Sequence, residues 1–175
     1  IERVRGALTQ LRAQGMQALV LDLRGNPGGV GPMSVPVARM LLDRSASLGT
    51  LRFRDFEQAF NVEPDADPFT GPLALLVDEG TASTSEIFAA GMRDLDRVTI
   101  FGGQPTAGAA LPSVIEELPS GAVLQYVVGD YHSPKGTAVE GKGIAPDVRV
   151  TETRADFVAG RDPVLEAAVT ALTER

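Results

Sequence analysis

The chain has 175 residues and a mass of 18.4 kDa, which is enough for one domain with a sizeable buried core. Its 16 basic and 23 acidic side chains give a formal net charge of −7, which excludes a general electrostatic attraction to nucleic acid. There is no cysteine, so disulfides, thiol catalysis and cysteine-bound metals are excluded, and a single histidine, His132, cannot form a multi-histidine metal site. No apolar run is long enough to cross a bilayer.

The first part of the chain predicts a helix, a strand, a glycine-rich turn and a second helix. Apolar residues recur at helical spacing before Gly15, at Ile1, Val4, Leu8 and Leu11. The continuous apolar run over 18–23 is typical of a central strand that is buried on both faces. It ends in the glycine-rich turn 25–31, and a helix is expected over 33–42.

The middle of the chain alternates strands and helices. We predict a strand over 50–54, an exposed loop over 61–72, a buried strand over 73–78, a helix over 83–94 and a third buried strand over 98–101. Short strands joined by helices pair in parallel through right-handed crossovers. The expected fold class is therefore α/β, with a mainly parallel sheet flanked by helices.

The last part of the chain changes pattern. Residues 114–118 and 123–128 flank a Pro-Ser-Gly turn and predict an antiparallel β-hairpin. Asp162 and Pro163 are typical of the N-cap and first turn of a final helix that runs to about residue 173. With no internal repeat and no dividing linker, residues 1–175 are expected to form a single domain. Because the chain starts with Ile inside a helical pattern, we expect a fragment of a longer protein.

Two segments follow predicted parallel strands, at the sheet edge where ligands bind in open α/β folds. They are the turn 25–31 and residues 79–86 (EGTASTSE). Ser83 has two interpretations. With Glu86 it fits the capping box S/T-x-x-E, in which its oxygen satisfies a helix N–H. It is also a serine on a tight strand-to-helix turn, beside free N–H groups at a helix N-terminus, which is the arrangement of an acyl-transfer nucleophile.

The glycine-rich turn also has two interpretations. Glycine is required wherever φ is positive, and it also lets a substrate backbone approach closely while amide N–H groups stay free. Two phosphate-binding motifs are excluded. The P-loop pattern G-x-x-x-x-G-K-[ST] lacks its lysine, and G-x-G-x-x-G is broken because Ser34 stands where the third glycine would be.

Four segments together resemble the catalytic domain of the carboxy-terminal processing (tail-specific) serine peptidases. They are 21–29 (LDLRGNPGG), 82–90 (ASTSEIFAA), 103–108 (GQPTAG) and 140–147 (EGKGIAPD), in the family's order over most of the chain. The resemblance implies an α/β sheet of the type shared with the Clp protease and crotonase cores, with the β-hairpin region toward the C-terminus. That fold agrees with the class predicted from the residues.

The resemblance assigns roles to residues in these segments. It implies that Ser83 is the nucleophile, that the Thr84 N–H is one oxyanion donor, and that Gly28 or Gly29 supplies the other. Ser85 is not the matching position, although it adjoins the same glutamate. No metal and no cofactor is implied.

The chain departs from the family at the general base. The typical member has a catalytic lysine in a T-x-G-K stretch, and here that stretch ends in Ala109. A glutamine that often assists corresponds to Ser113. Because alanine cannot accept a proton, the serine–lysine dyad is absent, and the chain is closer to members without the lysine, such as the tricorn protease and the interphotoreceptor retinoid-binding protein. Asp94 matches a family aspartate that we interpret as structural or as an ordinary surface acid.

Three explanations of the missing lysine stay open. The first is an upstream histidine outside this chain, as in the tricorn protease, with Glu140 orienting it. The second is a non-catalytic relative that keeps the cleft for binding. In the third, Lys135 or Lys142 reaches the site, although both also fit solvated turn lysines. His132 is a further candidate base, and no pattern places it near Ser83.

The function we expect is a serine endopeptidase that cleaves unstructured polypeptide through a Ser83 acyl-enzyme. One alternative is a domain that binds a peptide or an apolar ligand on the same fold. Another is a crotonase-like enzyme for acyl thioesters, because an enolate also needs two N–H donors. The expected partner is a polypeptide substrate, with homo-oligomer formation left open. By family analogy we expect the protein to act outside the cytoplasm, in the periplasm or secreted.

Overall fold

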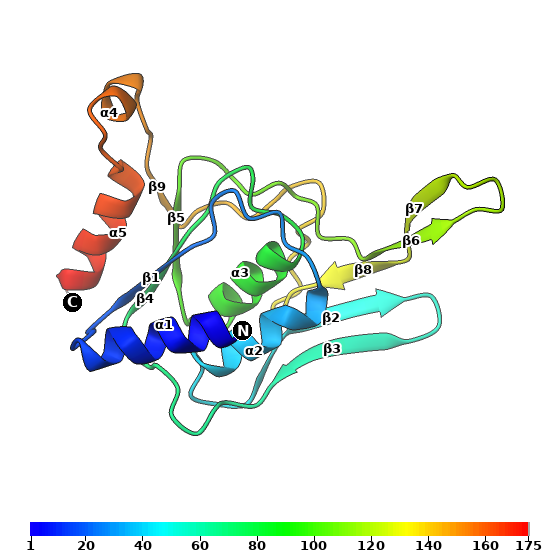
Figure 1. Cartoon of the computed structure of the whole chain (residues 1–175), viewed down its shortest axis with the longest axis horizontal. Helices are drawn as coiled ribbons and strands as arrows, with labels where there is room; N and C mark the ends of the chain where they lie inside the picture. Colours follow the sequence, from blue (N-terminus) through cyan, green and yellow to red (C-terminus); the bar gives the residue numbers. More distant parts are fainter. Residues whose placement is uncertain (175) are drawn as a thin grey trace.

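The computed structural model describes residues 1–174, and its centre is a parallel sheet (Figure 1). The strands are β1 (Leu19–Asp22), β4 (Leu73–Leu76), β5 (Thr99–Gly102) and β9 (Val148–Arg149), in the order β1-β4-β5-β9. Each neighbouring pair in this sheet runs parallel. The predicted α/β class with a parallel sheet and flanking helices is confirmed.

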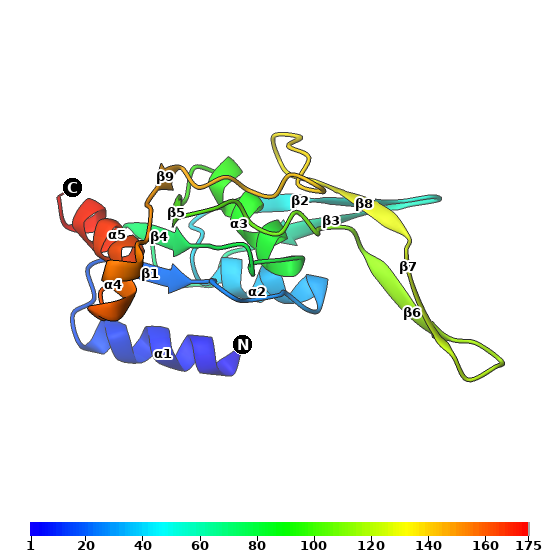
Figure 2. The ribbon, with the colours of Figure 1, turned by 90° about the horizontal axis from the view of Figure 1, so that it is seen from above.

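Helices cover this sheet on both faces (Figure 2). The helices are α1 (Glu2–Ala13), α2 (Ser34–Arg39), α3 (Thr84–Asp94), α4 (Arg154–Val158) and α5 (Pro163–Thr173), and a 3₁₀ turn (Gly31–Met33) precedes α2. Side chains alternate along β4, so Leu73 and Leu75 pack into the larger core with α3, while Ala74 and Leu76 pack on the opposite face with α5. The uninterrupted apolar run of this strand is thus explained by burial on both sides.

The prediction that residues 18–23 form a central strand is wrong. β1 lies at the edge of the sheet, with β4 beside it, and its residues are half-buried or exposed. Its two faces are nevertheless covered, because Leu21 packs against the larger core and Val20 against the smaller one. An apolar run therefore reports that both faces are covered by other elements and cannot tell a central strand from an edge strand.

A second, antiparallel sheet was only partly predicted. It contains β2 (Ala46–Phe53), β3 (Glu57–Val62) and β8 (Gly129–His132), in the order β3-β2-β8. The strand expected over 50–54 is the second half of β2, and the loop expected over 61–72 begins inside β3. Because only Phe60 and Val62 of β3 are buried, the strand has little apolar alternation for a sequence pattern to detect.

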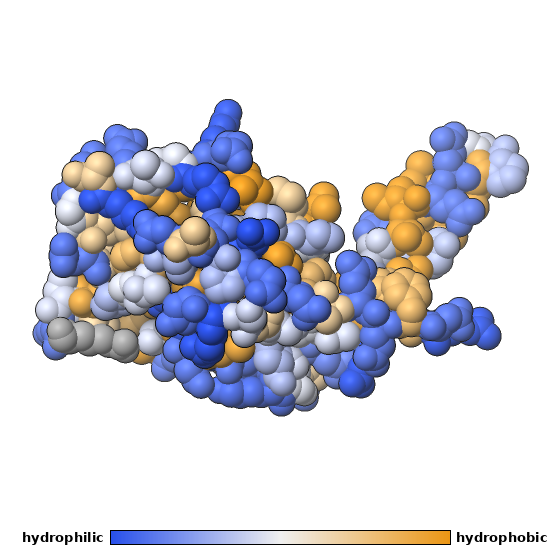
Figure 3. Space-filling model, turned by 90° about the horizontal axis from the view of Figure 1, so that it is seen from below, coloured by the Kyte–Doolittle hydropathy of each residue, from blue (hydrophilic) through white to orange (hydrophobic). Residues whose placement is uncertain are grey.

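The predicted β-hairpin is present as a projecting arm. We call β6 (Ser113–Glu117) and β7 (Val123–Val127) the arm, and it stands away from the rest of the molecule (Figure 1). All residues of both strands are exposed, and apolar side chains cover much of the arm (Figure 3). The predicted final helix is also confirmed, with Asp162 as its N-cap. Among the described helices, none is long and apolar enough to span a membrane.

The junction of α3 with β2 is so close that it requires glycine. A Cβ added to Gly91 would lie 2.7 Å from the Leu48 Cβ and 2.8 Å from its Cα. Beside this contact, the buried Tyr131 hydroxyl donates to the Leu48 carbonyl at 2.6 Å, and burial raises the pKa of this phenol. The second sheet is therefore packed tightly on α3, the helix whose N-cap is Ser83.

We predict that Gly91→Ala lowers the free energy of unfolding by about 1–3 kcal/mol, because the added methyl group must push α3 away from β2. Gly6→Ala is the matched control, since Gly6 lies inside α1 with no atom within 4 Å of an added Cβ. That control should stabilise the protein by up to about 1 kcal/mol. Urea unfolding measures both, and equal stabilities of the two variants would contradict the prediction.

Candidate active site

Two turns at the carboxyl ends of β1 and β4 lie against each other and form the base of the candidate site. We call residues 25–31 the glycine turn and residues 78–83 the serine turn. Four hydrogen bonds connect these turns and the residues that flank them: Gly25 N–H to Asp78 Oδ1 (2.8 Å), Ala82 N–H to Asn26 O (3.0 Å), Thr81 Oγ1 to Leu23 O (2.9 Å) and Thr84 Oγ1 to Gly29 O (2.9 Å). The two segments placed at strand ends by the sequence are therefore direct neighbours.

Ser83 is held in a strained backbone conformation. Its φ of 55° and ψ of −122° are rare for a residue other than glycine and cost about 1–3 kcal/mol, which the surrounding structure must offset. Ser83 and Glu86 occupy the two positions of a capping box, and the Ser83 N–H donates to Glu86 Oε2 at 3.0 Å. Within residues 1–174, no side-chain hydrogen bond caps α3 through the Ser83 hydroxyl. The Glu86 N–H, which is the partner of the hydroxyl in a capping box, donates to the Ser83 carbonyl at 2.8 Å, so capping of α3 does not require the hydroxyl.

Glu86 is the group that connects the serine turn to the next segment of the site. Its side chain is fully buried, and its carboxylate accepts hydrogen bonds from Ser83 N–H (3.0 Å), Thr106 Oγ1 (2.5 Å), Gly108 N–H (2.8 Å) and Ala109 N–H (2.9 Å). The bonds from Ser83 and Ala109 end on the same oxygen. Ala109, the position that carries the family lysine, is thus a close neighbour of Ser83 and is exposed.

The glycine turn approaches Ser83 so closely that a side chain would not fit. A Cβ on Gly28 would lie 2.7 Å from the Thr84 nitrogen and 2.8 Å from the Ser83 Cβ, and Gly28 has a positive φ of 84°. The Gly28 N–H donates to Asn26 Oδ1 at 3.0 Å. In residues 1–174 no hydrogen bond from the N–H groups of Gly29 and Thr84 is found. These two amides are the uncommitted donors beside the serine.

Glu140 joins this cluster indirectly. Its Oε2 accepts a hydrogen bond from Ala110 N–H at 2.9 Å, and the next residue, Gly141, donates its N–H to the Gly108 carbonyl at 2.8 Å. Over the described residues, no hydrogen bond connects Glu140 with Ser83. The structure therefore places the Glu140 carboxylate against Ala110, the residue that follows the lysine position, in a turn packed against the 106–110 segment.

The other candidate bases lie in different surroundings. His132 lies in β8 opposite Thr50, and its Nε2 is 2.9 Å from Asp130 Oδ2. The backbone nitrogen of Lys142 would lie 2.9 Å from a Cβ on Gly108, so its turn adjoins the lysine position, while its side chain is exposed. Lys142 is thus a candidate whose backbone adjoins the lysine position.

Asp94 and Lys135 meet at the opposite end of α3 from Ser83. Asp94 is buried and accepts hydrogen bonds from Ser133 Oγ (2.5 Å) and from the Lys135 N–H (2.9 Å), while Lys135 Nζ pairs with Asp96 (3.0 Å). A helix of 11 residues separates its ends by about 16 Å. Asp94 therefore anchors a loop on α3, as its structural interpretation requires, and Lys135 is remote from the serine.

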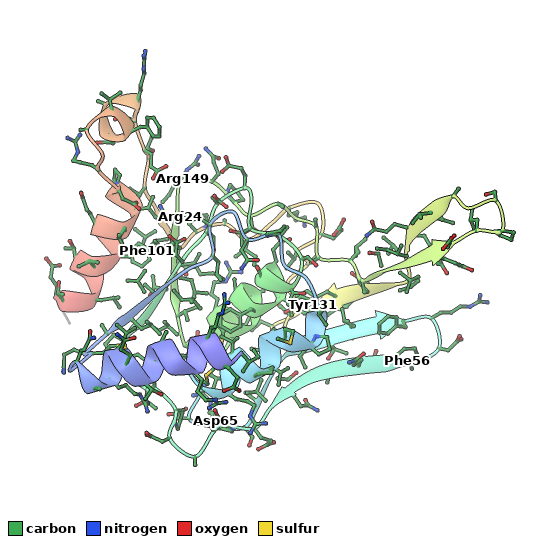
Figure 4. The ribbon with its side chains drawn as sticks, in the orientation of Figure 1. Arg24, Phe56, Asp65, Phe101, Tyr131 and Arg149 are labelled. Atoms are coloured by element: carbon green, nitrogen blue, oxygen red, sulfur yellow. The ribbon has the colours of Figure 1, made fainter. Side chains whose placement is uncertain are left out.

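Arg24 joins the glycine turn to the start of α5. Its guanidinium donates to both Asp22 and Asp162, and Figure 4 shows it at the same end of the sheet as Arg149. The hydrogen bonds from Arg24 hold the pKa of the Asp162 carboxyl below its usual range. This pair of contacts fixes the residue that precedes the glycine turn.

A serine on a strained strand-to-helix turn, beside uncommitted amide N–H groups, is the arrangement of serine hydrolases. Comparison with known proteins agrees with this class. The family model described as Peptidase family S41 matches residues 2–150. The chain belongs to peptidase family S41.

Named relatives and a solved structure point the same way. The chain is 34% identical over 175 residues to a carboxyl-terminal-processing protease of Synechocystis (98% of this chain, 40% of that protein). It is 35% identical over 144 residues to a chloroplastic C-terminal processing peptidase of Tetradesmus obliquus (82% and 31%). The structure of a photosystem II D1 C-terminal processing protease aligns with a TM-score of 0.73 at 34% identity, covering 84% of this chain and 38% of that one.

These matches cover only part of each relative. The chain spans less than half the length of each of these relatives. The tricorn protease structure aligns with a TM-score of 0.66 at 21% identity, which supports a shared fold. The predicted resemblance to the carboxy-terminal processing peptidases is confirmed.

Sequence reasoning missed what Glu86 does. It was visible as the glutamate of a capping box, and that pattern does predict its bond to the Ser83 N–H. Nothing local indicates that the same carboxylate also binds Thr106, Gly108 and Ala109. Within the described residues, no group of three or more histidine, aspartate or glutamate side chains could hold a metal ion.

We predict that Glu86→Gln lowers the free energy of unfolding by about 3 kcal/mol or more. The amide would turn an NH₂ group toward buried N–H and O–H donors and leave some of them without an acceptor. Glu79→Gln, an exposed change in the serine turn, should have no effect beyond about 0.5 kcal/mol. Urea titrations of both variants measure this, and a Glu86→Gln protein as stable as the control would rule the idea out.

Proposed function

We propose that this chain is the catalytic part of a serine endopeptidase of the carboxyl-terminal processing type. The observation that carries the proposal is Ser83 on its strained turn, with the uncommitted N–H groups of Thr84 and Gly29 beside it. Membership of family S41 and the names of the relatives favour this function over a ligand-binding domain and over a thioester enzyme.

In the proposed reaction, Ser83 Oγ attacks the scissile carbonyl while a general base takes its proton. The Thr84 N–H and the Gly29 N–H donate to the oxyanion, each donor contributing about 3–4 kcal/mol to transition-state stabilisation. Gly28 permits the close approach, and its own N–H becomes a donor if it leaves Asn26. The base returns the proton to the leaving amine, and water then hydrolyses the acyl-enzyme and regenerates Ser83.

The base in this proposal comes from outside residues 1–175. Ala109 carries no proton acceptor where the family lysine stands, so a group from another segment fills the space beside Ser83. Glu140, held by the Ala110 N–H, orients that base as a carboxylate partner. Lys142 is the alternative within the chain, because its turn packs on Gly108.

The substrate and setting follow from the relatives by analogy. We propose an unstructured polypeptide as the substrate and a compartment outside the cytoplasm as the place of action. Relatives named as chloroplastic peptidases and as bacterial processing proteases support this setting.

We predict that the intact protein reacts with a serine-directed fluorophosphonate at Ser83. Ser83→Ala should abolish the labelling, whereas Ser85→Ala, two residues along α3, should retain it. Intact-mass spectrometry and peptide mapping measure the adduct. Labelling that survives Ser83→Ala, or its absence from the unaltered protein, would overturn the proposed nucleophile.

We predict that Ala109→Lys in residues 1–175 raises the rate of fluorophosphonate labelling about 100-fold or more, because it places an amine next to Ser83 and supplies a general base. Ala107→Lys is the matched control, since Ala107 is also exposed but its N–H bonds the Thr81 carbonyl and not Glu86. The pseudo-first-order labelling rate against pH is the readout. Equal rates for the two lysine variants would show that position 109 does not serve the serine.

A further inference from the structure

An apolar pocket opens beside the glycine turn. It has a volume of about 300 Å³, which exceeds that of any single amino-acid side chain. Its apolar walls come from separate elements that meet here, and they include Val4, Leu23, Val30, Met33, Val37 and Phe88. Phe88 and Leu23 are buried at its base, while Val30 and Met33 are exposed at its opening. The pocket therefore presents an apolar interior to solvent without a side chain of this protein filling it.

The pocket shares its wall with the groups that would bind the oxyanion. Gly28, Gly29 and Thr84 line it, and the N–H groups of Gly29 and Thr84 are the uncommitted donors beside Ser83. When a substrate carbonyl accepts hydrogen bonds from those donors, the side chain of the same substrate residue is attached to the Cα next to that carbonyl. The side chain that precedes the scissile bond is thus the part of a substrate that lies nearest to this pocket.

Several polar side chains around the pocket are already partnered. The Thr84 hydroxyl donates to the Gly29 carbonyl at 2.9 Å, and the Ser34 hydroxyl donates to the Gly31 carbonyl at 2.9 Å. Asp22, the one acid in the wall, is paired with Arg24 at 2.7 Å. No lysine or arginine lines the pocket in the described residues. A charged side chain that entered would lose water and find no counter-ion, which is costly.

We propose that this pocket binds the side chain of the residue whose carbonyl Ser83 attacks, and that it selects large apolar side chains such as Leu, Met and Phe. The inference rests on the proposed peptidase function and adds the class of substrate. Small side chains leave apolar walls in contact with water, and each methylene group that fills such a pocket raises specificity about 10-fold or more. Acidic side chains are excluded by their desolvation.

Binding to the intact protein with Ser83→Ala tests the pocket without turnover. Peptides that are identical except for a C-terminal Leu, Phe, Ala, Asp or Lys represent the acyl-side product, and calorimetry measures their dissociation constants. We expect the Leu and Phe peptides to bind at least about 10-fold more tightly than the Ala peptide, and the Asp peptide most weakly. Equal affinities across the set, or no binding by any peptide, would overturn the inference.

A pocket-filling variant tests the location. Val37→Phe reduces the space from the α2 side, and Val169→Phe on the exposed face of α5 is the control. With substrates that vary at the same position, Val37→Phe should lower kcat/KM for Leu about 10-fold or more relative to Ala, while the control keeps the preference of the unaltered protein. An unchanged preference in a folded Val37→Phe protein contradicts the assignment. If that variant unfolds, the peptide series above decides the question.

The two proposals fail in different ways. Apolar preference in peptide binding without fluorophosphonate labelling or cleavage would end the peptidase proposal and leave the pocket assigned. Labelling and cleavage with no preference for an apolar side chain would end the pocket inference and leave the peptidase proposal in place.

Discussion

The site depends on one buried carboxylate. Glu86 has no exposed surface, yet it accepts hydrogen bonds from three backbone amides and one hydroxyl. A charge in that position would be costly if its lone pairs were unmet, and here the donors offset the loss of water. Because the donors come from two segments about 20 residues apart, the carboxylate connects the start of α3 with the 106–109 segment. Removing it would leave those donors buried together without an acceptor.

The hydrogen bond from the Ser83 N–H to Glu86 also explains how Ser83 can keep a strained backbone. A positive φ at a serine costs free energy, and the chain would relax if nothing opposed it. Glu86 accepts a hydrogen bond from the Ser83 N–H. The glycine turn contacts Ser83 so closely that a Cβ on Gly28 would overlap the Ser83 side chain. Further hydrogen bonds connect the two turns and the residues that flank them. The strain is thus maintained by contacts around the serine and not by the serine itself.

The parts of the fold that could be predicted from sequence are those with a strong local signal. The β4 run, the α3 pattern, the Asp162 cap and the arm all have their cause within a few residues. β3 and β8 were missed because each has few buried side chains and gains its place by pairing with β2, which no local pattern reports. The edge position of β1 was missed for a related reason, since an apolar run reports that both faces of a strand are covered and does not tell how many strands pair with it.

The candidate site also has residues that the sequence predicted and residues that it did not. Ser83, Thr84 and the glycine turn were found because they adjoin strand ends and carry unusual residue types, and resemblance then assigned their roles. The reach of Glu86 to Ala109 depends on tertiary structure and had no local signal. That contact concerns the missing lysine. The groups that hold Ser83 in position are backbone amides, glycines and Glu86, and no lysine is among them. In the proposed peptidase, the two uncommitted amides of Gly29 and Thr84 are therefore in place without the base. In this proposal, a base from another segment needs to reach only the space beside Ser83 and Ala109. It has no part in holding the serine in place.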